Sequence, residues 1–85
     1  MQIKLYNFLY HRVMEKINLT FSEILQEIMI EKCLTQTALA EKIGVKQSQV
    51  SEWLKGKSKP GYDNLRSMCE NLGVSAERLL GLDKE

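Results

Sequence analysis

Four polar side chains, Gln47, Ser48, Ser51 and Glu52, fall on one side of a predicted helix. A glutamine amide can pair bidentately with adenine, a carboxylate can accept a hydrogen bond from the cytosine amine, and a hydroxyl suits either a donor or an acceptor. These side chains are also small enough for the helix to enter a major groove closely. The pattern therefore predicts a surface that hydrogen-bonds with base edges. An ordinary solvated face is the alternative interpretation.

The opposite side of this helix is apolar. Val50, Trp53 and Leu54 recur at the i, i+3 and i+4 spacing of a helix that packs on a core. We expect the helix to span about residues 46–54, with one face buried and the other free.

A shorter helix precedes it. Thr35 is a residue type that caps helix starts, and Leu39, Ala40 and Ile43 follow at helical spacing. Gly44 then allows a tight left-handed turn without steric cost. Residues 35–54 are thus predicted to form two helices that meet at a large angle.

From Leu34 to Leu82 the chain resembles the phage repressor and Cro (XRE) family of helix-turn-helix regulators, over a little more than half of its length. The resemblance implies an all-α bundle of about five helices that binds double-stranded operator DNA, usually as a homodimer on a palindromic site. A repressor in a prophage or mobile element is implied by the same analogy. The positions that carry the resemblance are Leu34-Thr35-Gln36, Leu39-Ala40, Gly44-Val45, Val50-Ser51, Trp53, Gly56, Pro60, Leu65, Leu72-Gly73-Val74-Ser75 and Leu79-Leu80.

The resemblance also implies roles for individual residues. Gln47, Ser48 and Glu52 occupy positions similar to the base-contacting residues of the family, and Ser51 shares their face. Gln36 occupies the position of a phosphate-contacting glutamine. Lys46 departs from the pattern, because the family often has a Ser or Thr cap there, so we expect a less well capped helix start and a phosphate contact instead.

Positive charge is concentrated around the predicted motif. The whole chain has a net charge of +1, whereas residues 32–59 contain six lysines and two glutamates, a local balance of +4. Lys55 and Lys57 follow the second helix directly, where they would contact backbone phosphates and position the protein without reading sequence. A flexible basic loop is the alternative.

The helices around the motif complete a domain over residues 19–82, followed by a tail at 83–85. Thr20 and Glu23 have the spacing of a capping box, which predicts a helix to about Cys33. Further helices are expected from near Tyr62 to Gly73 and after Ser75. In the family the last region often supplies the dimer contact, and Leu79, Leu80 and Leu82 fit that role and core packing equally well.

Residues 1–18 lie outside the resemblance. Leu5, Phe8, Leu9, Val13 and Ile17 recur at helical spacing, which predicts an extra amphipathic helix packed either on the core of this domain or across a dimer partner. Leu5, Phe8 and Leu9 are therefore further candidates for the dimer contact. A strand through Ile3 and Leu5 is the alternative, but the alternation fails by Phe8.

The remaining reactive residues indicate no catalytic or metal site. Cys33 and Cys69 lack neighbours at metal-ligand spacing and are expected to be reduced core thiols on helices, which favours a cytoplasmic protein. His11 is the single histidine and lacks a nearby nucleophile or carboxylate cluster. The apolar stretches are too short for a membrane span. We expect neither an enzyme, nor a cofactor, nor a membrane protein.

The sequence thus predicts a DNA-binding transcriptional regulator that reads operator DNA through the major groove. A protein-interaction module, such as an antitoxin-like or adaptor subunit, is the alternative that the apolar N-terminal segment allows. The polar face of the second helix discriminates between them, because an adaptor would not need to keep it free of bulky side chains.

Overall fold

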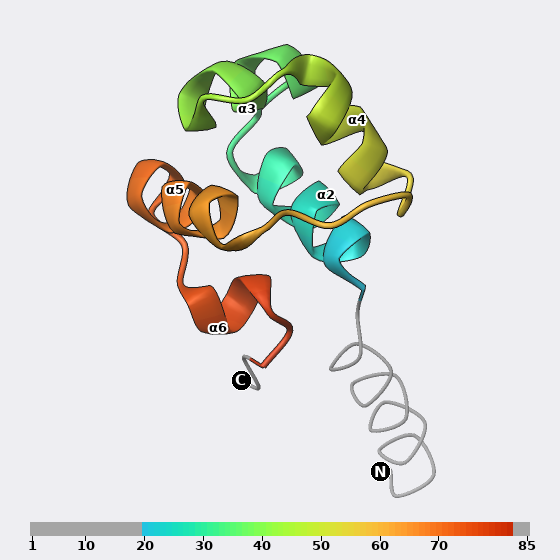
Figure 1. Ribbon diagram of the computed structural model, residues 1–85. Coiled ribbons are helices and arrows are strands. Elements are labelled where there is room, and N and C mark those ends of the chain that lie inside the picture. Colours follow the sequence, from blue (N-terminus) through green and yellow to red (C-terminus); the bar gives the residue numbers. More distant parts are fainter. Residues whose placement is uncertain (1–19, 83–85) are drawn as a thin grey trace, which may run out of the picture.

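The computed structural model describes residues 20–82, which fold into five helices without any strand in that range (Figure 1). The predicted all-α class is confirmed for this part of the chain. The predicted N-terminal helix, the alternative strand and the tail at 83–85 lie outside the described residues. The helices are α2 (Phe21–Glu31), α3 (Gln36–Ile43), α4 (Gln47–Leu54), α5 (Tyr62–Leu72) and α6 (Ala76–Leu79).

Helix α2 begins with the predicted capping box. The Thr20 hydroxyl accepts a hydrogen bond from the Glu23 N–H at 3.3 Å, and the Glu23 carboxylate accepts one from the Thr20 N–H at 2.9 Å. Two backbone donors that have no partner within the helix are thereby satisfied. This local exchange fixes where α2 starts.

The end of α2 differs from the prediction and changes the environment of Cys33. The helix ends at Glu31, and Cys33 adopts a left-handed conformation with φ of 56°. This turn lets the Leu34 N–H donate to the Met29 carbonyl at 2.9 Å and directs Leu34 onto the core. Cys33 is consequently an exposed turn residue, so its prediction as a core thiol on a helix was wrong, whereas Cys69 is partly buried on α5.

One apolar core joins all five helices. Leu25 and Ile28 of α2 are fully buried, as are Val50 of α4 and Met68 of α5. Burying side chains of this size stabilises a fold by about 1.5–3 kcal/mol each relative to exposure. The other buried members of the core are Ile24, Leu39, Ala40, Ile43, Trp53, Leu72, Val74 and Leu79.

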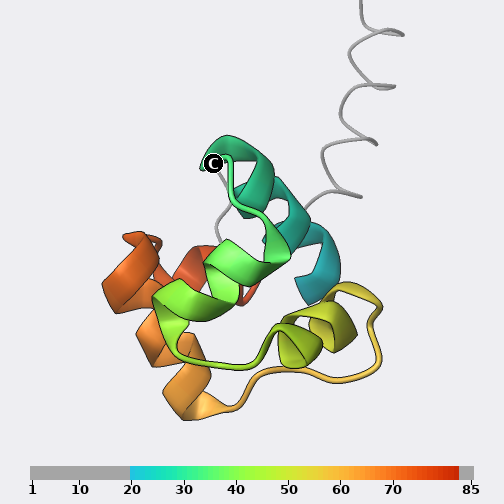
Figure 2. The ribbon, with the colours of Figure 1, turned by 90° about the horizontal axis from the view of Figure 1, so that it is seen from above.

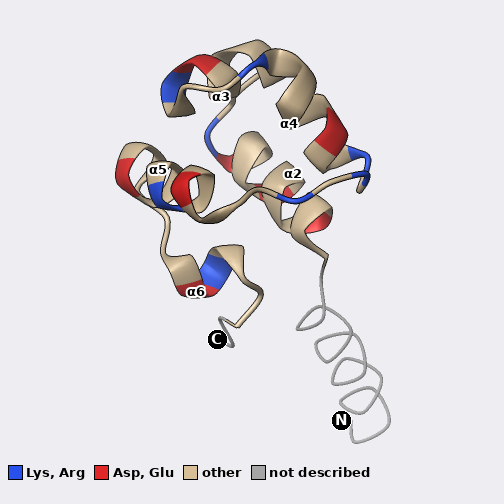
Figure 3. Cartoon of the chain, viewed as in Figure 1, with Lys and Arg blue, Asp and Glu red and all other residues tan. Residues whose placement is uncertain are grey.

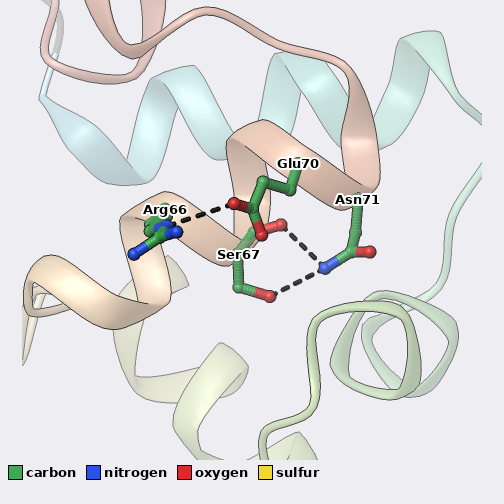
Figure 4. A network of polar contacts seen from close by, with 4 residues as sticks. All are labelled: Arg66, Ser67, Glu70 and Asn71. Atoms are coloured by element: carbon green, nitrogen blue, oxygen red, sulfur yellow. Dashed lines mark hydrogen bonds and ion pairs between the residues drawn. The ribbon is translucent and has the colours of Figure 1, made fainter.

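A polar link holds α5 against the end of α3, and Figure 4 shows the part of it that lies within α5, from Asn71 to Ser67. The Ser67 hydroxyl donates to the carbonyl of Ile43 at 2.9 Å, and Ser67 accepts in turn from the Asn71 amide, at both its hydroxyl and its carbonyl. The last carbonyls of a helix have no partner within that helix. Ser67 supplies one for Ile43, so α5 fixes the position of the turn between α3 and α4.

A second polar link connects α2 with α6. The Arg78 guanidinium donates to both carboxylate oxygens of Glu31, at 2.9 and 2.6 Å, across 47 positions of sequence. These hydrogen bonds, aided by the positive charges of Arg78 and Lys32, hold the pKa of the Glu31 carboxyl below its ordinary value of 4.5. The paired arrangement fixes the short α6 on the larger helix.

Replacing Glu31 by glutamine is expected to lower Tm slightly at neutral pH and to leave it unchanged in acid. A carboxyl whose pKa is lower in the folded than in the unfolded state adds stability above its unfolded pKa and loses it as the pH falls through the folded pKa. The effect is small because the Glu31 side chain is 54% exposed, so solvent screens its attraction to Arg78. Thermal unfolding of wild type and Glu31→Gln at a series of pH values from neutral to acid measures the difference in Tm between them.

The control is Glu70→Gln. Glu70 pairs with Arg66 at 3.1 Å within α5, so this ion pair does not connect two helices. Its loss is therefore expected to change Tm less than the loss of the Glu31–Arg78 pair. A Tm difference between wild type and Glu31→Gln that stays the same from neutral to strongly acidic pH would contradict the assigned role of the carboxylate.

Candidate nucleic-acid interface

The predicted two-helix motif is present as α3 and α4. The Thr35 hydroxyl caps α3 by accepting from the Ala38 N–H at 3.0 Å. Gly44 ends α3 in the left-handed conformation, with φ of 80°, and its N–H donates to the Ala40 carbonyl at 2.8 Å. Both helices lie at one end of the domain, opposite α6 (Figure 1), and they are nearest to the viewer when the domain is seen from that end (Figure 2).

The two faces of α4 have the environments that the sequence predicts. Val50 is fully buried and Trp53 is 2% exposed, whereas Leu54 is partly buried against the core. On the other face Gln47, Ser48 and Glu52 are exposed. Their amide, hydroxyl and carboxylate groups are therefore available to a ligand.

Ser51 differs from the other three members of the polar face. It is only partly exposed, because it lies between the exposed face and the side that packs on the domain. Its hydroxyl is thus at the edge of the available surface.

The start of α4 is capped from inside the helix. The Lys46 side chain makes no capping hydrogen bond, as its residue type predicts, and it is exposed. Instead, the Gln49 carbonyl oxygen Oε1 accepts from the Lys46 N–H at 3.3 Å. This role of Gln49 was not predicted from the sequence, although a Gln three residues after the cap position is the second half of a capping box and could have indicated it.

Gln36 and Gln47, which begin α3 and α4, contact each other. The Gln47 amide Nε2 donates a hydrogen bond to the Gln36 Oε1 across the motif. The sequence predicted each residue separately as a DNA contact, but it did not predict that the two side chains contact each other. The hydrogen bond restricts the Gln47 side chain and leaves its own carbonyl oxygen available to accept.

Exposed lysines lie at both ends of α4. Lys55 is the C-cap of α4, and Lys57 follows Gly56, whose φ is 75°. The Lys57 N–H donates to the Glu52 carbonyl at 3.0 Å, which fixes the turn to the helix end. Figure 3 shows basic segments at the end of α3, before α4 and in the turn after α4, with one acidic segment on α3 and another on α4.

The candidate dimer residues have different environments. Leu79 is 1% exposed and belongs to the core, whereas Leu80 and Leu82 are 58% and 62% exposed. Of the three, only Leu80 and Leu82 are thus available for a contact with another molecule. Leu5, Phe8 and Leu9 lie outside the described residues.

Residues 20–82 show neither a metal site nor a membrane span. This part of the chain contains no cluster of three His, Cys, Asp or Glu side chains that could bind a metal ion. Within the same range, no helix is long and apolar enough to cross a membrane.

Comparison with known proteins agrees with this geometry. A family model described as "Helix-turn-helix" matches residues 25–79, which include all of α3, α4 and α5. The chain is 35% identical over 60 residues to the HTH-type transcriptional activator BcrR of Enterococcus faecalis. The match covers 71% of this chain and 29% of that protein. No solved structure matched significantly. The chain therefore belongs to the phage repressor and Cro (XRE) type of helix-turn-helix family, a family of DNA-binding transcriptional regulators.

Proposed function

We propose that this protein is a sequence-specific transcriptional regulator that inserts α4 into the major groove of operator DNA. The observation that carries the proposal is the contrast between the two faces of α4. Val50 and Trp53 anchor one face in the core, while Gln47, Ser48 and Glu52 remain exposed on the other. A fixed helix with a free polar face meets the requirement for reading base edges.

The exposed residues divide into two roles. Gln47, Ser48, Ser51 and Glu52 are proposed to contact bases, because their hydrogen-bonding groups can distinguish one base edge from another. Lys46, Lys55 and Lys57 are proposed to contact phosphates on either side of the groove, together with Gln36. Phosphate contacts set the position of the helix, and base contacts then select the sequence.

Glu52 is proposed to lower the affinity for DNA that differs from the operator. A carboxylate near phosphates lowers affinity unless it accepts a hydrogen bond, which the cytosine amine can supply. At other bases it would stay unpaired and repelled by the backbone. Such a residue increases specificity by penalising competing sites.

A homodimer on a palindromic operator is part of the proposal. Leu80 caps the end of α6 and Leu82 follows it, and both side chains are exposed. Helix α6 lies at the end of the domain opposite α3 and α4 (Figure 1). Two half-sites about 10 base pairs apart would present the same groove face to each protomer. Because the two contacts add, each protomer can bind weakly by itself. We place this regulator in the cytoplasm and assign it no catalytic step.

The test is enrichment from a randomised duplex pool at two salt concentrations, with sequencing of the retained DNA. An enriched palindrome with half-sites about 10 base pairs apart would support a dimeric operator reader. Weak, salt-sensitive retention without enrichment would show phosphate attraction alone. That result would contradict sequence reading and favour the protein-interaction module.

Lys57→Ala is expected to weaken binding to operator and random DNA by the same factor. Removing one phosphate-binding lysine should reduce the slope of log K against log salt by about 1, since one fewer counterion is released. Titrations by fluorescence anisotropy at several salt concentrations measure the slope. Arg66→Ala, which removes the same charge from an exposed position on α5, is the control and should leave the slope unchanged. A weakening confined to the operator would contradict the phosphate role of Lys57.

A further inference from the structure

Two adjoining hollows with mainly apolar linings meet at α5 and α6, and the first also has the polar Ser58 and Lys59 at its wall. The first has a volume of about 410 Å³ and the second about 400 Å³, and both are lined by Leu65, Leu79 and Leu80. We call the pair the α5–α6 groove. Because the two hollows share a wall, one elongated apolar ligand could fill both.

The first hollow extends to the start of α2 and the turn after α4. Its lining includes Phe21 and Ile24 from α2, Trp53 from α4, and Pro60. The second hollow continues along α5 and α6, between Tyr62 and Ala76. Tyr62 is 74% exposed and Leu80 is 58% exposed, so the groove presents apolar surface that the described residues leave uncovered.

The chain enters the described structure at this groove. Thr20, the first described residue, lines the first hollow together with Ser22. Nineteen residues precede it, so whatever position they adopt, their last residue lies beside the groove. The end of that segment therefore adjoins the apolar surface of the groove.

The preceding segment carries the matching side chains. Leu5, Phe8, Leu9, Val13 and Ile17 recur at the spacing of one helix face. Ile17 is three residues from Thr20, within about 10 Å of extended chain. A helix from Leu5 to Ile17 would be about 20 Å long, enough to pass from one hollow to the next.

We propose that residues 5–17 dock as an amphipathic helix in the α5–α6 groove of their own chain. Val13 and Ile17 fill the hollow beside Thr20, and Leu5, Phe8 and Leu9 reach the hollow beside Tyr62. Docking in the same chain is favoured over docking from a second copy because a short tether gives an effective concentration in the millimolar range. The proposal does not depend on DNA recognition. It uses Leu80 for an intramolecular contact, so of the two exposed leucines only Leu82, which does not line the groove, remains for the proposed dimer contact.

The test uses a spin label at the rim of the groove in the full chain. Cys33→Ser and Cys69→Ser remove the native thiols, and serine nearly preserves the size of Cys69, which lines the second hollow. Glu77→Cys introduces a thiol at an exposed position of α6 that does not line the groove. We expect the amide NMR signals of residues 5–9 to disappear through paramagnetic broadening and to return when the label is reduced. A label at exposed Glu41→Cys on α3 is the control and should leave these signals intact.

A second variant separates docking from folding. Phe8→Asp with Leu9→Asp changes only residues outside the described domain, so the signals of residues 20–82 should persist while the broadening of residues 5–9 disappears. The proposal would be overturned if, in the chain that keeps Phe8 and Leu9 and carries the spin label at position 77, the signals of residues 5–9 were not broadened. Mixing isotope-labelled chains that lack the spin label with spin-labelled chains tests for a second copy, and broadening in that mixture would overturn docking in the same chain.

Discussion

Trp53→Ala is expected to lower the free energy of unfolding by about 3–5 kcal/mol, as large-to-small substitutions of buried aromatic residues do. Trp53 is the single tryptophan of the chain and is 2% exposed. Its ring packs edge-on against Phe21 of α2, with centroids 6.3 Å apart and an interplanar angle of 83°. The substitution would therefore leave a cavity between α2 and the helix that carries the polar face.

The destabilisation is large compared with the total stability of a natural domain, about 5–15 kcal/mol. Urea unfolding followed by far-UV circular dichroism measures it, because this signal does not depend on the removed indole. Glu52→Ala on the same helix is the matched control, since Glu52 is exposed and should change stability by no more than about 0.5 kcal/mol. A change below about 1 kcal/mol for Trp53→Ala would contradict the assignment of Trp53 as the anchor of α4.

Gln47→Ala is expected to remove about 1–3 kcal/mol of discrimination at one base position of the enriched operator. Binding to random DNA should change little, because a neutral amide releases no counterions. Anisotropy titrations on the operator and on duplexes altered at each position measure the difference. Lys57→Ala provides the contrast, since it is expected to weaken all duplexes alike. Equal effects on operator and random DNA for both variants would contradict the division of roles.

The hydrogen bond between Gln36 and Gln47 predicts that the effects of substituting the two residues are coupled. If Gln36 orients the Gln47 amide, the effects of Gln36→Ala and Gln47→Ala on operator affinity should not add. A double-mutant cycle should give a coupling energy of at least about 0.5 kcal/mol, as contacting residues do. Strictly additive effects would indicate that each glutamine acts separately on the DNA.

The sequence alone was sufficient for features that depend on neighbouring residues. The capping box of Thr20 and Glu23, the cap at Thr35 and the left-handed Gly44 were predicted and are confirmed. Each involves hydrogen bonds or backbone angles within about four residues, so local chemistry determines it. The buried and exposed faces of α4 were predicted for the same reason, because helical periodicity assigns side chains to faces.

Cys33 shows where local reasoning failed. The periodicity of α2 continues to this residue, but the chain leaves the helix two residues earlier to bring Leu34 onto the core. The gain from burying Leu34 depends on helices elsewhere in the chain. A window of sequence around Cys33 does not contain that information.

The tertiary structure alone decided contacts between residues far apart in sequence. Sequence left Leu79 and Leu80 with two interpretations, and packing placed Leu79 in the core and Leu80 at the surface. Sequence identified Gln36 and Gln47 separately, but only the angle between α3 and α4 brings their amides together. The Glu31–Arg78 pair likewise requires α6 to return to α2. Such contacts depend on how whole helices pack, and helix packing is a property of the complete core.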